Sequence, residues 1–464
     1  DNVNALLLID FGSTYTKLTA VDIDKHEIIA HAKSLTTVQS DIMIGFQKAY
    51  ELMKEKCKDI KLEFKEMLAC SSAAGGLRMV AVGLVPDLTA EAAKRAALGA
   101  GSRVLEVYSH ELSRSEMKDM MAKKPDIILL AGGTDGGNKD CIIHNAKMIA
   151  EYIKDIPIVV AGNQKANDEI EDIFIAEEID YVITENVMPK LNVLNVDPAR
   201  EAIRNVFMNR IVEAKGMKKA ESYINGILMP TPAAVLTAAK ILADGTDEEE
   251  GIGDLIVVDI GGATTDIHSI ADGEPKTPGV MRIGLEEPYA KRTVEGDLGM
   301  RVSADSLGQV VSTRNFKKYA PDLKYDIRER CNYLSQHVNE IPQTPEEIAF
   351  DEAMSMAATE IAMERHVGVI EEVYSPMGKM FSLTGKDLTE TKYVIGTGGV
   401  LIHSENPGKI LSAGLYNEEN PMYLKPKGPK LLIDRSYILS AMGIMATKYP
   451  NEAIRILKKY LVEV

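Results

Sequence analysis

Two segments that lie far apart in the chain contain the residue types that bind the phosphates of a nucleoside triphosphate. Each is an apolar run that ends in an aspartate and leads into a turn with glycine and hydroxyl residues. The residues are Asp10, Gly12, Ser13, Thr14 and Lys17 in the first segment, and Asp259, Gly261, Gly262, Thr264 and Thr265 in the second. Glycine lets the backbone come close to phosphate oxygens, and the amides of such a turn can donate to them. The pattern therefore predicts a phosphate-binding site.

The side chains around these turns predict how the site would work. We expect Asp10 and Asp259 to hold Mg²⁺ through the water molecules that this ion retains, and to position the attacking water. Lys17 can neutralise charge on the terminal phosphates, and the hydroxyl groups of the two turns can add donors. One such turn alone fits an ordinary hairpin equally well. Two copies 249 residues apart favour the phosphate-binding interpretation.

A third glycine segment follows an apolar run further along the chain and contains Gly396, Gly398 and Gly399. A short glycine motif is a weak signal by itself, but its place downstream of the second turn favours a role in the same site. We expect these three glycines to form the floor of an adenosine pocket.

The elements that must position these motifs are predicted by hydrophobic patterning. Apolar runs rich in Val, Ile and Leu alternate with segments of helical spacing, which is typical of parallel sheets covered by helices and predicts an α/β fold. Strands are expected at 6–10, 18–22, 27–32, 67–71, 255–259 and 392–395, and helices at 41–58, 89–99, 117–123, 199–215 and 231–243. Residues 126–190 show a βαβαβ alternation that resembles half of a doubly wound sheet.

The predicted domain organisation has two lobes and one insertion. An acidic stretch from Asp244 to Gly251 is the predicted boundary between the lobes. The segments are 1–125 (first lobe, N-terminal part), 126–190 (inserted α/β subdomain), 191–251 (rest of the first lobe and a first connecting helix), 252–434 (second lobe) and 435–464 (second connecting helix and C-terminal segment).

The motifs and their order resemble the actin, sugar-kinase and heat-shock-chaperone ATPase superfamily. DFGSTYTK at 10–17, DIGGATTDI at 259–267 and VIGTGGVL at 394–401 are similar to its first phosphate, second phosphate and adenosine motifs. The segments 229–235 and 441–446 are similar to its two connecting helices. The resemblance implies a two-lobe actin-like (ribonuclease H-like) ATPase fold, with ATP or ADP and Mg²⁺ in the cleft between the lobes.

A narrower resemblance covers essentially the whole chain. CSSAAGGLRM at 70–79, LAGGTDGGN at 130–138 and the DIGGATTD turn resemble the glutamate mutase accessory family, the GlmL/MutL type that is unrelated to DNA repair. The resemblance implies an ATP-dependent reactivating chaperone. Its partner would be an adenosylcobalamin-dependent mutase or aminomutase of the glutamate, ornithine or lysine type, from which it would release damaged cobalamin.

One departure from the superfamily pattern leaves part of the mechanism open. Heat-shock chaperones open the first connecting helix with Glu-Pro-Thr, and Met229 stands in place of that glutamate here. The general base for water and the route of coupling to a partner are therefore unassigned.

A small-molecule kinase and a non-enzymatic or filament-forming actin relative stay open as other functions of this fold. The sequence specifies neither the client mutase, nor the oligomeric state, nor direct contact with cobalamin.

Composition narrows the remaining classes of function. The 464 residues carry a formal net charge of −16, which disfavours nucleic acid and anionic membranes as partners. The four cysteines include no CxxC pair, which argues against structural zinc and a thiolate-held iron–sulfur cluster. No apolar run approaches the roughly 20 residues of a membrane span. No charged leader with an apolar segment is visible, so a cytoplasmic location is expected.

Several weaker signals allow two interpretations. The Gly132–Gly137 segment follows a strand, and it fits either a second anion or cofactor site or a tight turn. The loop at 71–76 is more simply a turn than part of the site. His268 is expected to be a strand histidine and not a catalytic one. Arg78 and Arg301 could pair with phosphates, but surface ion pairs are the expected role.

Overall fold

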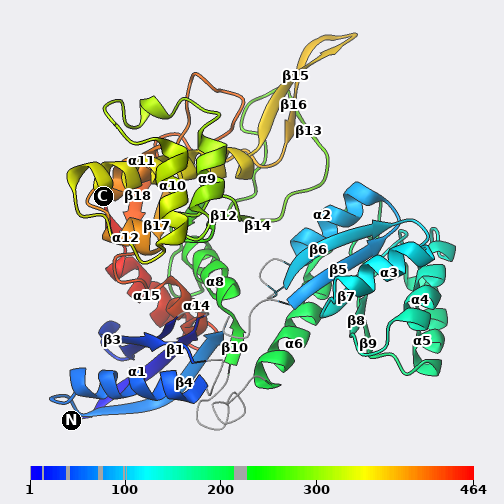
Figure 1. The fold of residues 1–464 in the computed structure, drawn as a ribbon, viewed down its shortest axis with the longest axis horizontal. Helices are drawn as coiled ribbons and strands as arrows, with labels where there is room; N and C mark the ends of the chain where they lie inside the picture. The colour runs from blue at the N-terminus through cyan, green and yellow to red at the C-terminus, as the bar shows by residue number, and fades with distance from the viewer. Residues whose placement is uncertain are drawn as a thin grey trace. The chain divides into compact units, whose positions relative to one another are not determined.

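The structure is a computed structural model, and it describes residues 2–12, 15–37, 42–71, 77–97, 100, 102–213 and 227–464 (Figure 1). Contacts divide the chain into two compact units, Asp1–Ala234 and Val235–Val464. The division falls inside helix α8 (Thr231–Asp244), ahead of the acidic stretch that was the predicted boundary. That stretch is instead a turn of the second unit, where Glu249 pairs with Arg455 at 2.5 Å.

The first sheet of unit 1 has five strands in the order β10-β4-β1-β2-β3. β1, β2 and β3 form an antiparallel meander, while β4 and β10 continue the sheet in parallel. The strands are β1 (Val3–Phe11), β2 (Tyr15–Asp22), β3 (Glu27–Leu35), β4 (Leu62–Ser71) and β10 (Ile227–Pro230). Helix α1 (Ile42–Lys56) packs on β2 and β3, and its Phe46 contacts Phe11. The four strands predicted in this region and the helix are confirmed.

The second sheet of unit 1 has five parallel strands in the order β6-β5-β7-β8-β9. They are β5 (Leu77–Gly83), β6 (Ser102–Ser109), β7 (Ile127–Leu130), β8 (Ile158–Val160) and β9 (Tyr181–Ile183). The predicted insertion at 126–190 contains only the last three. The sheet begins at Leu77 because β5 pairs with β7, so the predicted boundary at 126 cuts through one sheet.

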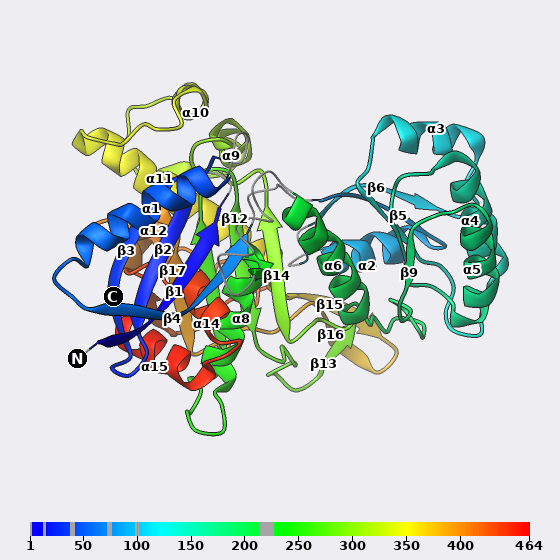
Figure 2. The same cartoon turned by 90° about the horizontal axis from the view of Figure 1, so that it is seen from below.

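Both faces of this second sheet are covered by helices (Figures 1 and 2). The helices are α2 (Pro86–Ala97), α3 (Arg114–Ala122), α4 (Asp140–Tyr152), α5 (Asn167–Ala176) and α6 (Asp197–Glu213). Successive strand residues alternate between two hydrophobic clusters. Met79 and Ala81 pack in the same core as α2 and α6, whereas Val80 and Val82 pack with α3, α4 and α5. Burial on both faces explains why these strands are continuous apolar runs.

The main sheet of unit 2 repeats the strand order of the first sheet. Its order is β14-β12-β11-β17-β18-β19, in which β11, β12 and β14 form an antiparallel meander and β17 and β18 run parallel to β11. The strands are β11 (Leu255–Ile260), β12 (Thr265–Ile270), β14 (Ala290–Glu295), β17 (Tyr393–Thr397), β18 (Lys430–Ile433) and β19 (Val462–Glu463). Each unit thus has a three-stranded meander and two further strands parallel to its first strand, and unit 2 adds β19 antiparallel to β18.

Helices of unit 2 cover this sheet, and the long helix α11 supplies much of the core. They are α9 (Ala304–Val311), α10 (Ile327–Gln336), α11 (Pro345–His366), α12 (Gly399–His403), α13 (Pro407–Ser412), α14 (Leu439–Met445) and α15 (Pro450–Tyr460), with a short 3-10 turn at Phe316–Lys318. The segment at 435–464, expected to hold the second connecting helix, contains two helices, α14 and α15, separated before Pro450. Among the described residues, no helix is both long and apolar enough to cross a bilayer.

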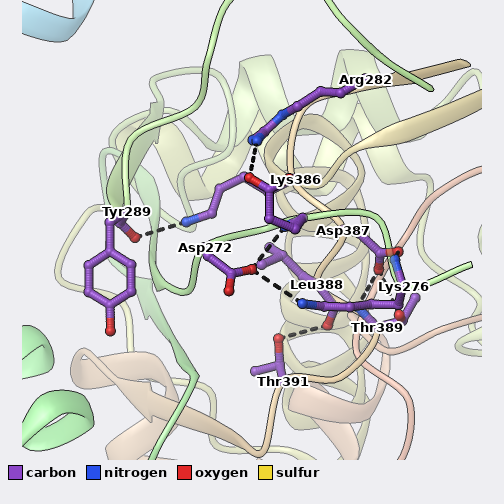
Figure 3. A network of polar contacts seen from close by, with 10 residues as sticks. Asp272, Lys276, Arg282, Tyr289, Lys386, Asp387, Leu388, Thr389 and Thr391 are labelled. Atoms are coloured by element: carbon purple, nitrogen blue, oxygen red, sulfur yellow. Dashed lines mark hydrogen bonds and ion pairs between the residues drawn. The ribbon is translucent and has the colours of Figure 1, made fainter. Parts of the chain in front are cut away.

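A smaller three-stranded sheet in unit 2 lies beside a network of polar contacts. It contains β13 (Val280–Ile283), β15 (Val369–Ser375) and β16 (Gly378–Thr384). After β16, the fully buried Lys386 donates to the carbonyl of Tyr289 at 2.9 Å and to Ser269 at 3.2 Å. Figure 3 shows the contact with Tyr289, and also Asp387, which accepts from the backbone of Lys276 and from Thr389. These contacts fix the chain between β16 and β17.

Candidate functional site

In unit 1, Asp10 lies near the end of the central strand β1, where the predicted site begins. Across the sheet it is paired with Lys17 on β2 and with Cys70 on β4. The hydroxyl of Thr231, the first residue of α8, donates to Asp10 Oδ1 at 2.8 Å. Burial raises the pKa of the Asp10 carboxyl, opposed by the Thr231 hydrogen bond and the charge of Lys17. A carboxylate with a raised pKa accepts protons more readily than a solvated one.

Cys70 is a neutral neighbour of Asp10. Its sulfur accepts from Thr231 Oγ1 at 3.7 Å, and burial together with the Asp10 charge raises the pKa of the thiol well above its usual value. Because only the thiolate is a strong nucleophile, Cys70 is suited to packing beside Asp10 and not to covalent chemistry.

The first glycine turn is tightly closed. Gly12 N–H donates to the carbonyl of Tyr15 at 3.0 Å, and Thr36 Oγ1 donates to the carbonyl of Gly12 at 2.7 Å. A Cβ at residue 12 would lie 2.6 Å from the carbonyl oxygen of Tyr15, so only glycine fits. The predicted phosphate donors Ser13 and Thr14 lie outside the described residues, as does the loop at 72–76.

Unit 2 repeats this hairpin at the same point of its sheet. Asp259 lies on the central strand β11, two residues before Gly261, whose N–H donates to the carbonyl of Thr264 at 2.9 Å. Across the sheet Asp259 is paired with Asp266 on β12 and Thr397 on β17. The spacing from aspartate to cross-strand partner is the same in both units, so Asp266 takes the place that Lys17 has in unit 1.

The backbone behind the second turn is held by residues 298–303. The N–H groups of Met300 and Arg301 donate to the carbonyls of Gly261 and Gly262, both at 3.0 Å. Thr265 is buried and donates to the carbonyl of Leu298 at 2.6 Å, so its hydroxyl holds the turn and does not supply the predicted phosphate donor. The Thr264 hydroxyl donates to Asp266 Oδ1 at 2.9 Å.

Asp266 also forms an ion pair with Arg292 at 2.8 Å, and both side chains are largely buried. His268 follows on the same strand and is buried. Burial and the neighbouring Arg292 lower the pKa of His268 to about 3. The histidine is therefore neutral in the folded chain, in line with the expected structural role. Arg301 pairs with Asp351 at 2.7 Å, as the ion-pair interpretation predicted.

The third glycine segment meets the second turn at Gly398. This residue has φ +92°, and a Cβ there would lie 2.4 Å from the carbonyl oxygen of Ile260 and 2.7 Å from Asp259 Oδ1. Two of the predicted motifs are thus adjacent. Gly396, in contrast, is enclosed by the side chains of Ile433, Leu401 and Leu411, so its role is packing and not the predicted adenosine contact. Gly399 is exposed, and no atom lies within 4 Å of the position of its Cβ.

Asp434 is a site residue that the sequence prediction missed. It is buried after β18, and it accepts from Thr397 Oγ1 at 3.1 Å and from the N–H groups of Ile438 and Leu439 at the start of α14. Burial raises the pKa of Asp434, while these hydrogen bonds oppose the rise. The sequence carries a signal for it, because Asp434, like Asp10 and Asp259, directly follows or ends an apolar strand run.

In each unit the residue after an equivalent parallel strand ties the start of a helix to a neighbouring strand, but through different contacts. Thr231 follows β10 and donates to Asp10 on β1, whereas Asp434 follows β18 and accepts from Thr397 on β17. Thr231 was noted only as part of a connecting-helix motif, and its contact with Asp10 was not predicted.

The carboxylates of Asp10 and Asp259 have the chemistry that Mg²⁺ requires, since this ion prefers a few hard oxygen ligands and retains water. Within the described residues, no group of three or more His, Cys, Asp or Glu side chains is arranged to hold a metal ion. A cation at either aspartate would take its other ligands from water and phosphate.

The same strand order in both units, with the same aspartate–glycine hairpin on each central strand, defines a two-lobe actin-like α/β fold. A family model described as MutL protein matches residues 6–461. The curated Protein MutL of Clostridium tetanomorphum is 63% identical over 462 residues, covering 100% of both chains. The chain belongs to the MutL protein family.

Solved structures give much weaker similarities. Glycerol kinase of Plasmodium falciparum, in a structure with ADP, is 10% identical with a TM-score of 0.34, covering 98% of this chain and 93% of that one. The ethanolamine utilization protein EutJ of Carboxydothermus hydrogenoformans is 12% identical with a TM-score of 0.28, covering 95% and 88%. Scores this low carry no weight, so the fold assignment rests on the strand order.

Proposed function

We propose that this protein is an ATP-dependent reactivating factor for an adenosylcobalamin-dependent mutase or aminomutase. It would bind ATP with Mg²⁺ and hydrolyse it, and the conformational change that follows hydrolysis would release damaged cobalamin from the client enzyme. The observation that supports nucleotide chemistry is the aspartate–glycine hairpin, which occurs on the central strand of both sheets with the same turn hydrogen bond. Membership of the MutL protein family and the motif resemblance support the class of client.

In this proposal the two hairpins bind the phosphates and the two aspartates act on the reacting groups. The glycine turns let the backbone approach the phosphates, where the N–H of Gly262 can donate while those of Gly12 and Gly261 close their turns, and Lys17 adds positive charge. Asp10 and Asp259 orient the attacking water and the hydrated cation. Magnesium bound with the nucleotide would supply positive charge that stabilises the transferring phosphoryl group. Positioning and charge, not a covalent nucleophile, would carry the reaction.

Met229 stands where heat-shock chaperones have a glutamate, so another group must couple the phosphates to the connecting helix. We assign this coupling to the hydrogen bond between Asp10 and Thr231. Met229 is buried on β10, where it pairs with Cys70, so it cannot act as a base. Thr231 begins α8, and α8 runs without interruption across the division between the units. A change of charge or ligand at Asp10 would alter its hydrogen bond with Thr231, and α8 would transmit that change.

The first experiment is to measure phosphate release from Mg–ATP by the purified chain and by Asp259→Asn. Slow release by the parent, reduced about 100-fold or more in the variant, is expected because the carboxylate that orients water and cation is lost. Asp247→Asn, at an exposed position of the acidic turn, is the matched control and should keep parental activity.

The outcomes separate the proposed function from its alternatives. No binding of ATP would contradict the nucleotide proposal altogether. Binding without phosphate release, together with phosphorylation of an added metabolite, would favour a small-molecule kinase. If release occurs, inactivated adenosylcobalamin-dependent mutases are added one at a time with ATP, and recovery of activity identifies the client.

A further inference from the structure

The second sheet of unit 1 contains a crevice that the ATPase proposal does not use. Numbered along the chain, its strands have the order 2-1-3-4-5, so the chain runs to one side from β5 to β6 and to the other side from β7 onward. In such doubly wound parallel sheets, ligands bind outside the carboxyl ends of the strands at the point where the direction reverses. That point here lies between β5, which ends at Gly83, and β7, which ends at Leu130.

A cavity of about 170 Å³ occupies this position. Its walls come from the start of α2, the loop after β7 and the segment after β9, and the residues that carry the argument are Leu84, Leu88, Gly132, Gly133, Thr134 and Val187. The lining is mostly apolar, and none of the described residues that form it is charged. A cavity of about 150 Å³ holds a molecule as large as benzene, so the space suits a compact ligand of roughly six to ten non-hydrogen atoms.

One wall of the cavity presents backbone donors without acceptors. In the described part of the chain, the N–H groups of Gly132, Gly133 and Thr134 have no hydrogen-bond partner, although Gly133 is buried. Buried backbone N–H groups are almost always paired, and leaving one unpaired costs about 1–3 kcal/mol. The unpaired N–H of the buried Gly133, flanked on the cavity wall by those of the half-buried Gly132 and Thr134, is therefore a binding element for an oxygen acceptor.

The loop is held in this conformation by two buried asparagines. Asn186 donates to the carbonyl of Gly133 at 2.9 Å and to Asp135 at 3.0 Å, and the Asn163 amide donates to the carbonyls of Gly137 and Asn138. Gly133 has φ +75°, and a Cβ there would lie 2.1 Å from the carbonyl oxygen of Asn138. The donors are thus fixed before any ligand arrives, which lowers the entropic cost of binding.

From these observations we infer that the crevice between β5 and β7 binds a small organic carboxylate. Its carboxylate accepts hydrogen bonds from the amides of Gly132, Gly133 and Thr134, and its apolar body packs against Leu88 and Val187. The absence of charged residues among the described lining favours a monoanionic carboxylate over a phosphate ester. This site is separate from the aspartate–glycine hairpins and does not depend on the proposed ATPase activity.

The test uses the lack of tryptophan in the natural chain. Leu191 lines the cavity with 70% of its surface exposed, so Leu191→Trp places a single fluorescent reporter at the rim. Ala90→Trp, at an exposed position of α2 outside the cavity, is the matched control. Isovalerate is titrated into the full-length variants, with its neutral isostere isovaleramide as the second probe.

We expect a saturable change of Leu191→Trp emission with isovalerate, no change in Ala90→Trp, and binding of isovaleramide about tenfold weaker or more. Leu88→Phe in the reporter background reduces the cavity and should abolish the change, with circular dichroism confirming that the variant folds. Ligand-observed NMR on the unsubstituted chain repeats the binding measurement without any substitution. Equal binding of the two probes, unchanged affinity in Leu88→Phe, or no saturable binding in either measurement would overturn the assignment.

Discussion

At the scale of single residues, the proton affinity of Asp10 is set by burial, which raises its pKa, and by neighbouring groups, which lower it. Burial disfavours the carboxylate, while the Thr231 hydroxyl and the charge of Lys17 favour it. In unit 2 the aspartate of the central strand has different charged neighbours. Asp259 has Asp266 as its cross-strand partner in place of a lysine, and Arg292 neutralises Asp266. Two copies of one hairpin therefore provide two carboxylates in different electrostatic surroundings, which lets them take different roles.

Removal of the Thr231 hydroxyl should shift the titration of Asp10. In Thr231→Val the hydrogen bond that favours the carboxylate is lost, so the pKa of Asp10 rises further. In the proposed function Asp10 acts as the carboxylate, so the acidic limb of the pH–rate profile for ATP hydrolysis is expected to move to higher pH. Stability should fall by about 1–3 kcal/mol because a buried acceptor loses its partner. Thr231→Ser keeps the hydroxyl and should keep the parental profile; a profile that Thr231→Val leaves in place would contradict the role of this contact.

His268 predicts a second residue-scale effect, on stability in acid. Its pKa is lowered to about 3 in the folded chain, against an ordinary value near 6.5. Between these values the unfolded chain takes up a proton that the folded chain does not, so the free energy of unfolding falls as pH drops through this window. From pH 6.5 to 4.5 this contribution is about 2–3 kcal/mol.

Denaturant unfolding at both pH values measures this effect. His268→Gln should lose less stability than the parent on acidification, whereas His403→Gln, at an exposed position, should follow the parent. Equal losses in the parent and in His268→Gln would show that His268 is not the group responsible.

At the scale of elements, the strand β17 and the turn that follows it bring Gly398 against Asp259. An alanine Cβ at this position would contact both the Ile260 carbonyl and the Asp259 carboxylate, and its backbone would adopt φ +92°. We expect Gly398→Ala to lose about 1–3 kcal/mol of stability and to lose most ATP hydrolysis through displacement of Asp259. The neighbouring Gly399→Ala meets no atom within 4 Å and should stay close to the parent in both measurements. Similar losses in the two variants would contradict the steric argument.

Sequence patterning predicted the elements whose residues lie close together in the chain. The β1–β2 and β11–β12 hairpins, their glycine turns and the helices α1, α2, α3, α6 and α8 were predicted because apolar period and turn residues are local signals. The strand β5 was missed, since its identity depends on pairing with β7 some fifty residues later. The contacts of Thr231 with Asp10 and of Asp434 with Thr397 span 221 and 37 residues, and no local pattern specifies them. The prediction for Thr265 was wrong because a hydroxyl next to a turn can equally bond inward.

At the scale of the whole molecule, the chain combines two architectures that divide the tasks proposed for it. The repeated meander sheets carry the aspartate–glycine hairpins, one in each unit, whereas the doubly wound sheet is inserted between β4 and β10 of the first. Because β4 and β10 are neighbours in the first sheet, the insertion of a second sheet between them does not change the strand order of the first. The crevice between β5 and β7 thus belongs to a different sheet from the strand that holds Asp10.

The stability of the whole chain should also rise on the alkaline side, because Lys386 is fully buried. Burial lowers its pKa to about 7, against an ordinary value near 10.5. Between these values the unfolded chain holds a proton that the folded chain has released, so the free energy of unfolding increases with pH. The full contribution across the window is at most about 5 kcal/mol. Above the ordinary pKa the lysine is neutral in both the folded and the unfolded chain, so its titration no longer changes the stability. Below pH 7 it is protonated in both, and the buried charge lowers the stability by the full amount.

Comparison with Lys386→Met isolates this contribution from every other titrating group. The variant should gain stability relative to the parent at pH 7 and below, despite losing the bonds to Ser269 and Tyr289, and this advantage should shrink as pH rises toward 10. Denaturant unfolding at several pH values gives the difference directly, and Lys430→Met, at an exposed position of the same unit, should show no such trend. A difference between Lys386→Met and the parent that stays constant with pH would mean that Lys386 is charged in the folded chain. A buried charge would then require an acidic partner, and the acidic groups whose charges raise the pKa of Lys386 are Glu287, Asp254 and Asp272.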